Sequence, residues 1–274
     1  METVSEKRCF EGTQGVYRHA SRATGTEMTF GLYLPPGPGP HPVLWFLAGL
    51  TCTHENAMVK AAAQLHAAEA GLALVFPDTS PRGEGVADDE AFDMGQGAGF
   101  YVDATEEPWA PHFKMWSYIA DELPELLSAE FPLEMGRQGI TGHSMGGHGA
   151  LTLGMGLKGR FASLSAFAPI CQPTQSDWGR KQFTGYLGAD ESKWLAHDAT
   201  HLMETEGFEG EVLVDTGAAD EWGEGLLRSS ALGGAMAKRG QPGAFRMQAG
   251  YDHSYFFVQS FIGEHIAFHA EHLW

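Results

Sequence analysis

The chain of 274 residues has only three cysteines, which stand far apart at Cys9, Cys52 and Cys171. Such a set fits neither a disulfide framework nor a Cys-rich zinc site, and it favours a reducing compartment. Basic residues are also scarce, since 17 Lys and Arg face 35 Asp and Glu, a formal net charge of −18 with neutral His. An acidic chain repels phosphate backbones and anionic membrane surfaces, so we expect no nucleic-acid partner.

Long apolar runs are missing as well. The longest ones, such as Val43 to Leu47 and Leu72 to Phe76, fall far short of the ~20 residues that a membrane-spanning helix needs. The segment from Met1 to Gly12 is charged and has no apolar stretch behind it, which excludes a secretory signal. The composition of 43% hydrophobic and 11% aromatic residues is typical of a folded globular protein. We therefore expect a soluble, cytoplasmic protein without a membrane partner.

Short runs rich in branched and aromatic residues alternate with longer helix-like stretches. This alternation predicts an α/β fold, with a mostly parallel central sheet and helices on both faces. We expect strands at Leu32–Leu34, Val43–Leu47, Leu72–Phe76, Gln138–Thr141, Ser163–Ala168, Val212–Asp215 and Phe245–Gln248. We expect helices at Ala57–Ala70, Trp116–Phe131, Gly149–Leu157 and Ile262–Leu273. No repeat or composition shift marks a boundary, so residues 1–274 are predicted to form one domain.

The segment from Gly142 to Gly146 reads Gly-His-Ser-Met-Gly and lies between a predicted strand and a predicted helix. Gly-x-Ser-x-Gly in this context is typical of the nucleophile turn of the α/β-hydrolase fold, where strained serine dihedrals require small neighbours. We predict that Ser144 is a nucleophile and that the Met145 amide, at the helix start, stabilises an oxyanion. A glycine-rich turn without chemistry is the alternative, and no Gly-Lys-Ser/Thr follows to favour a phosphate-binding loop.

A serine nucleophile needs a histidine base and a carboxylate that orients it, and on this fold they follow in the order Ser, Asp or Glu, His. Asp220 lies in the turn after the strand that starts at Val212, and we predict it as the acid. Asp215, inside that strand, is the competing candidate and reads as structural. His253 follows the last predicted strand and is the predicted base. His143 and His148 flank the nucleophile, where a packing or hydrogen-bonding role is favoured.

The loop after Val43–Leu47 is the expected source of a second oxyanion donor. Gly49 permits a sharp turn there, and we predict the Leu50 amide as that donor. Cys52 lies two residues further on and is expected close to the substrate pocket, either as a redox-sensitive thiol or, more simply, as a buried bystander.

Three more histidines share one face of the last predicted helix by their spacing. A metal site would need an acidic or cysteine ligand nearby, and none is evident, so a solvated helix face is the favoured interpretation. These residues are His265, His269 and His272.

Five longer segments carry a more specific signal than the serine motif alone. They are Gly49–Thr53, Phe76–Gly83, Gly97–Thr105, Gly142–Leu151 and Gly250–Phe257. Through them the chain resembles the S-formylglutathione hydrolase, or esterase D, family nearly from end to end.

The resemblance implies a Ser144, Asp220 and His253 triad, with oxyanion amides from Leu50 and Met145. It also implies hydrolysis of the small-molecule thioester S-formylglutathione to formate and glutathione, without a cofactor. The resemblance further suggests a homodimer. A broad-specificity short-chain carboxylesterase or an acyltransferase with the same triad is the alternative function.

The chain departs from the family pattern between Gln172 and Gly179, where the family usually carries Asn-Pro and then Cys-Pro-Trp-Gly. Trp178 is kept, and we expect it, or Met145, to close the acyl side of the pocket, so that rates fall with acyl length. Because glutathione is anionic, some positive charge is expected on the thiol side. The sequence does not choose among the candidates Lys60, Arg82, Arg180 and Lys181.

Overall fold

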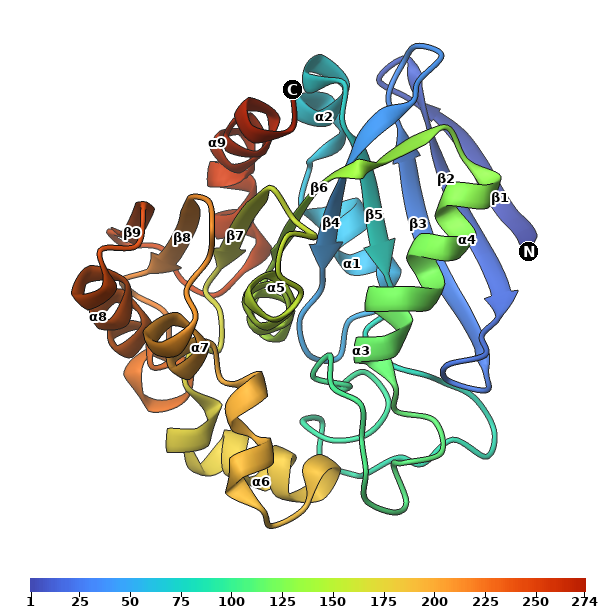
Figure 1. The fold of residues 1–274 in the computed structure, drawn as a ribbon. Helices are drawn as coiled ribbons and strands as arrows, with labels where there is room; N and C mark the ends of the chain where they lie inside the picture. Colours follow the sequence, from blue (N-terminus) through green and yellow to red (C-terminus); the bar gives the residue numbers. More distant parts are fainter.

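The computed structural model describes all 274 residues around a nine-stranded sheet with the order β1-β2-β3-β5-β4-β6-β7-β8-β9 (Figure 1). Strands β1 to β3 pair antiparallel, β3 pairs antiparallel with β5, and all pairs from β5 to β9 are parallel. The strands are β1 (Glu2–Cys9), β2 (Gly12–Ala20), β3 (Glu27–Leu34), β4 (His41–Leu47), β5 (Ala73–Pro77), β6 (Leu133–Gly142), β7 (Ser163–Phe167), β8 (Val212–Gly217) and β9 (Gly243–Gln248). The predicted fold class is confirmed.

Helices cover both faces of the sheet, with α4, α5, α7 and α8 on one face and α1, α2 and α9 on the other (Figure 1). The α-helices are α1 (His54–Lys60), α2 (Gln64–Ala70), α3 (Met115–Ser117), α4 (Leu123–Glu130), α5 (Met145–Gly156), α6 (Asp177–Leu187), α7 (Ala199–Thr205), α8 (Ser229–Arg239) and α9 (Tyr255–Leu273). Short π-helical turns are η1 (Tyr118–Glu122) and η5 (Gly223–Leu227), and 3₁₀ turns are η2 (Pro173–Gln175), η3 (Glu191–Lys193) and η4 (Leu195–His197).

The predicted strands are all present, whereas β1 and β2 are additional. The predicted helix Ala57–Ala70 is wrong as one element, because α1 ends at Lys60 and α2 begins at Gln64. Between them Ala62 has φ +56°, a left-handed conformation that interrupts the helix. Ala61 and Ala63 on either side are buried, so the break packs two alanines into the core.

The prediction of a solvated histidine face on the last helix is wrong. His265 and His269 are fully buried, and only His272 is partly exposed. Helix α9 packs against β6, β7 and β8, and these strands supply polar partners such as Ser163, whose Oγ lies 2.7 Å from His269 Nδ1. The structure holds no group of three or more His, Cys, Asp or Glu side chains arranged for a metal ion.

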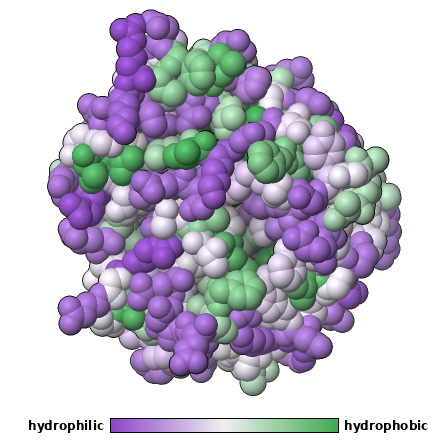
Figure 2. Space-filling view, turned by 180° about the vertical axis from the view of Figure 1, so that it is seen from behind, coloured by the Kyte–Doolittle hydropathy of each residue, from purple (hydrophilic) through white to green (hydrophobic).

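The core of 67 buried hydrophobic residues lies between the sheet and its helices, and every residue of β4 and β5 is buried. The surface is polar: in the space-filling view, hydrophilic residues cover most of the face shown and apolar residues form scattered patches (Figure 2). No helix combines the length and the apolar character that a membrane span requires. Because β4 to β9 run parallel, their carboxyl ends meet at one edge, where ligand sites form in such sheets.

Candidate active site

Ser144 stands at the tight turn between β6 and α5, with φ +59° and ψ −120°. A Cβ at Gly142 would lie 2.2 Å from the Gly146 carbonyl oxygen, and a Cβ at Gly146 would lie 2.0 Å from the Leu47 carbonyl oxygen. Only glycine fits at either position, which explains the spacing of the motif. The strained turn lets the serine side chain project from the sheet edge towards a cavity rather than along the helix.

Asp220 and His253 meet at the same edge of the sheet. His253 Nδ1 lies 2.6 Å from Asp220 Oδ2, and the two side chains are 15% and 1% exposed. Backbone hydrogen bonds hold their loops together, since the Ala218 amide donates to the Gln248 carbonyl and the Ala219 amide donates to the Tyr251 carbonyl, both at 2.9 Å. The carboxylate can therefore orient the ring and stabilise its protonated form.

Ser144 and His253 line one cavity of about 190 Å³. The structure contains no hydrogen bond between Ser144 Oγ and His253 Nε2, so the two groups share the cavity without direct bonding. Catalytic hydrogen bonds of this kind are often long without substrate and tighten when substrate binds. The arrangement brings together the three side chains that the sequence placed in a triad.

The loop after β4 approaches the nucleophile closely. A Cβ at Gly49 would lie 3.1 Å from Ser144 Cβ and 3.6 Å from its Oγ. The next amide, that of Leu50, donates no hydrogen bond within the protein, and Met145, as the first residue of α5, has no acceptor inside its helix. Two free amides therefore flank Ser144, as an oxyanion site requires.

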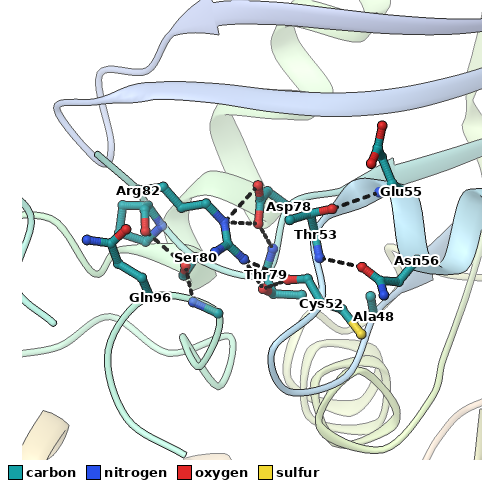
Figure 3. A network of polar contacts seen from close by, with 12 residues as sticks. Ala48, Cys52, Thr53, Glu55, Asn56, Asp78, Thr79, Ser80, Arg82 and Gln96 are labelled. Carbon is teal, nitrogen blue, oxygen red and sulfur yellow. Dashed lines mark hydrogen bonds and ion pairs between the residues drawn. The ribbon is translucent and has the colours of Figure 1, made fainter. Parts of the chain in front are cut away.

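A polar network holds the far end of the loop after β4, at Cys52 and Thr53 (Figure 3). The Cys52 carbonyl accepts hydrogen bonds from Thr79 Oγ1 at 2.5 Å and from Arg82 Nη2 at 2.7 Å. Arg82 is itself held by Asp78, whose Oδ1 lies 3.1 Å from Nε, and Thr53 caps helix α1 with its side chain. The loop that carries Leu50 is thus anchored at its distal end.

Cys52 lines the cavity, and the residue as a whole is 9% exposed. Burial raises the pKa of Cys52 above its usual value, which disfavours the reactive thiolate. These features agree with the bystander interpretation of this residue.

The other candidates for the acid and the base do not contact the proposed triad as an acid or a base would. Asp215 is fully buried in β8 and binds Arg246 and His265, not His253. His143 packs on His253 with ring centroids 4.7 Å apart, and burial keeps its pKa well below the usual value. Burial, reinforced by His197, lowers the pKa of His148 to about 3. Neither imidazole ring is hydrogen-bonded to Ser144, so both rings pack around the turn; the only such link is the His148 backbone amide, which donates to the Ser144 carbonyl at 3.0 Å.

Aromatic side chains form much of the cavity wall. Trp178 and Trp222 stack with centroids 6.0 Å apart and planes 20° apart, and Phe92 lies 6.1 Å from Trp178. The Trp178 Nε1 donates to Asp93, which also pairs with Lys181 at 2.7 Å. The predicted place of Trp178 in the pocket agrees with this geometry, whereas Met145 is fully buried and absent from the cavity lining.

Sequence reasoning missed four wall residues, which are Phe92, Trp222, Leu227 and Tyr255. Trp222 and Tyr255 stand two positions after Asp220 and His253, so their nearness to the triad loops was a usable signal. Phe92 comes from the long segment between β5 and α3, where no pattern indicated it.

Three of the four basic candidates for the thiol side are already paired. Arg82 binds Asp78, Arg180 binds Glu191 and Lys181 binds Asp93. Lys60, at the end of α1, forms no ion pair. None of the four contributes to the cavity lining.

The sheet order and the serine turn define an α/β hydrolase, and comparison with known proteins agrees. The family model described as "Putative esterase" matches residues 21–268. S-formylglutathione hydrolase of Paracoccus denitrificans is 66% identical over 99% of this chain and 98% of its own length. The mouse S-formylglutathione hydrolase is 46% identical over 100% of this chain and 99% of its own length. A solved S-formylglutathione hydrolase from Agrobacterium tumefaciens superimposes with a TM-score of 0.97 at 46% identity, covering 100% of both chains.

The chain is therefore a serine hydrolase of the esterase family, and it belongs to the S-formylglutathione hydrolases within it. This confirms the resemblance seen in its motifs.

Proposed function

We propose that this protein hydrolyses S-formylglutathione to formate and glutathione, with Ser144 as nucleophile, His253 as base and Asp220 as its orienting acid. The observation that carries the proposal is the 2.6 Å contact between His253 and Asp220 beside a cavity that Ser144 and His253 share. Relatives of nearly the same length and 66% and 46% identity bear the name of this activity.

In the first half of the reaction, His253 Nε2 takes the Ser144 proton while Oγ attacks the formyl carbon. The amides of Leu50 and Met145 stabilise the negative charge on the formyl oxygen. The carbon–sulfur bond then breaks and glutathione leaves with the sulfur electron pair. The departed thiolate takes up the proton held by His253, so the imidazole is neutral again and glutathione is released as the thiol. Since a thiolate is a stable leaving group, we expect little dependence of this step on proton donation.

In the second half, His253 draws a proton from water, and the resulting hydroxide adds to the formyl-serine ester. The ester bond breaks, formate leaves, and the proton returns to Ser144 Oγ. The summed reaction consumes one thioester and one water and yields one carboxylic acid and one thiol. Each residue is restored, and no cofactor takes part in these steps.

The decisive experiment measures S-formylglutathione turnover by the wild type beside Ser144→Ala, with Ser128→Ala as control. Ser128 is exposed on α4 and binds only the Glu125 carbonyl. We expect Ser144→Ala to lower kcat by about 10⁴-fold or more, while Ser128→Ala keeps the wild-type rate. Equal rates for wild type and Ser144→Ala would refute the nucleophile.

The same assay separates the alternative function. We expect a higher kcat/KM for S-formylglutathione than for p-nitrophenyl acetate, because the formyl group is the smallest acyl group. The reverse order would favour a broad carboxylesterase with the same triad.

A further inference from the structure

A network of polar side chains, most of them buried, joins the strands that lead to the proposed triad. Asp215 of β8 is fully buried and accepts hydrogen bonds from Arg246 Nε at 2.7 Å and Gln248 Nε2 at 2.9 Å, both on β9. His265 of α9 places its Nε2 3.0 Å from the same carboxylate. Arg246 also reaches α9, where its Nη1 donates to Glu264 at 2.6 Å. One carboxylate therefore connects β8 with β9 and α9.

The network continues to the nucleophile strand. His265 Nδ1 lies 2.9 Å from Ser165 Oγ on β7, and that oxygen lies 2.8 Å from Thr141 Oγ1 on β6. His269 Nε2 also contacts Ser165 Oγ, at 2.8 Å. The His265 ring stacks on Phe167 with centroids 3.7 Å apart. An unbroken chain of polar contacts thus crosses from β6 to β9 inside the protein.

Each end of the network stands close in sequence to a triad residue. Thr141 precedes Ser144 by three positions, Asp215 precedes Asp220 by five, and Gln248 precedes His253 by five. Helix α9, which carries His265, begins two positions after His253. The contacts therefore join the three chain segments whose relative positions decide whether the triad assembles.

We infer that this polar network, defined as the buried Thr141, Ser165, Asp215 and His265 with the partly exposed Arg246 and Gln248, positions the triad by fixing β6, β7, β8, β9 and α9 relative to one another. These are positioning residues, since none touches the reacting atoms, and the inference rests on the proposed function. Hydrogen bonds restrict donor–acceptor distances to a few tenths of an ångström, and catalytic geometry tolerates errors of only about 0.5 Å.

Stability alone gives a weak reason for this network. Burying a carboxylate and an imidazole costs desolvation, and well-packed apolar residues often serve a core at least as well. Burial would raise the pKa of Asp215, yet hydrogen bonds from His265 and Arg246 bring it well below its usual value. Burial lowers the pKa of His265 despite that carboxylate. A charged, directional contact is thus maintained where an apolar contact would fill the space.

The test compares Asp215→Asn and Ser165→Ala with two matched controls. Glu122→Gln changes another buried carboxylate, which accepts hydrogen bonds from Ser21 Oγ and the Ala23 amide far from the triad strands. Ser21→Ala removes a buried hydroxyl from that same remote network. Each variant is assayed for kcat and KM on S-formylglutathione, and the low-field proton NMR signal of the His253–Asp220 hydrogen bond is recorded.

We expect Asp215→Asn to lower kcat by about 10- to 100-fold with KM within about twofold, because a displacement near 1 Å can cost about 10²-fold. Ser165→Ala should lower kcat by a smaller factor, and both variants should shift or broaden the His253 signal. The two controls should keep the wild-type kcat and signal. Should Asp215→Asn fail to fold, the comparison of Ser165→Ala with Ser21→Ala decides.

The inference is overturned if the network variants keep the wild-type kcat and NMR signal, or if the controls lose as much kcat. Failure of the proposed function would look different. In that case the wild type itself would not turn over S-formylglutathione, while the NMR signal would still report on the network.

Discussion

Replacing Asp220 by Asn tests the proposed triad at its most clearly defined contact. The substitution keeps the shape of the side chain but removes the charge that faces His253 Nδ1 at 2.6 Å. When His253 takes up the serine proton, its charge and that of the carboxylate are centred about 4 Å apart, which corresponds to about 4 kcal/mol at an effective dielectric constant of about 20. Dividing by about 1.4 kcal/mol per tenfold gives a loss near 10³-fold.

A second effect enlarges that loss. An amide in place of the carboxylate can donate to His253 Nδ1, which favours the wrong ring tautomer and raises the expected loss in kcat towards about 10⁴-fold. Asp252→Asn is the matched control, because this exposed carboxylate stands next to His253 in sequence and binds only Ser254.

The assay is kcat on S-formylglutathione, with circular dichroism to verify folding. Asp252→Asn should stay within about threefold of wild type, since exposed charges are well screened. A folded Asp220→Asn variant that loses less than tenfold would refute the assignment of Asp220 as the orienting acid.

Two further predictions concern the cavity wall and acid stability. For p-nitrophenyl esters, kcat/KM should fall from acetate to butyrate by about tenfold or more per excluded methylene. Trp178→Ala should make this decrease smaller, whereas the remote control Trp274→Ala should leave it unchanged. Butyrate hydrolysed as fast as acetate by the wild type would contradict a closed acyl pocket. Burial lowers the pKa of His148 to about 3 from 6.5, so between these values the unfolded state binds a proton that the folded state does not. The free energy of unfolding should therefore decrease below pH 6.5, and His148 should account for about 2 kcal/mol of the decrease at pH 5. Urea titrations at several pH values should show a decrease that is smaller by this amount in His148→Gln. The same decrease in the variant and the wild type would exclude His148 as its cause.

The sequence was sufficient to predict the parallel part of the sheet and the residues at its carboxyl edge. Val43–Leu47 and Val212–Asp215 are continuous apolar or nearly apolar runs, as strands buried on both faces require. The order serine, aspartate, histidine then selected Asp220 and His253 from many candidates, because each follows a strand of the same sheet. The short Asp220–His253 distance agrees with that selection.

The elements that were missed lack such a pattern. Strand β1 reads Glu-Thr-Val-Ser-Glu-Lys-Arg-Cys and is almost entirely exposed, so its pairing with β2 gives no apolar signal. The break at Ala62 is invisible for a related reason, since alanine favours helix and nothing local predicts a left-handed residue. Tertiary packing of Ala61 and Ala63 decides the break.

The three histidines of α9 show most clearly where sequence reasoning ends. Their spacing correctly placed His265 and His269 on one helix face, but it carried no information about what lies opposite that face. The partners of His265 are Ser165 on β7 and Asp215 on β8, which lie 100 and 50 residues away in sequence. A row of polar residues on one helix face is predicted to face solvent unless complementary polar groups on the neighbouring strands are known. The partners of Asp215 were equally invisible in the sequence. Asp215 was therefore considered only as a less favoured candidate for the acid, and not as the centre of a network that joins the strands leading to the proposed triad.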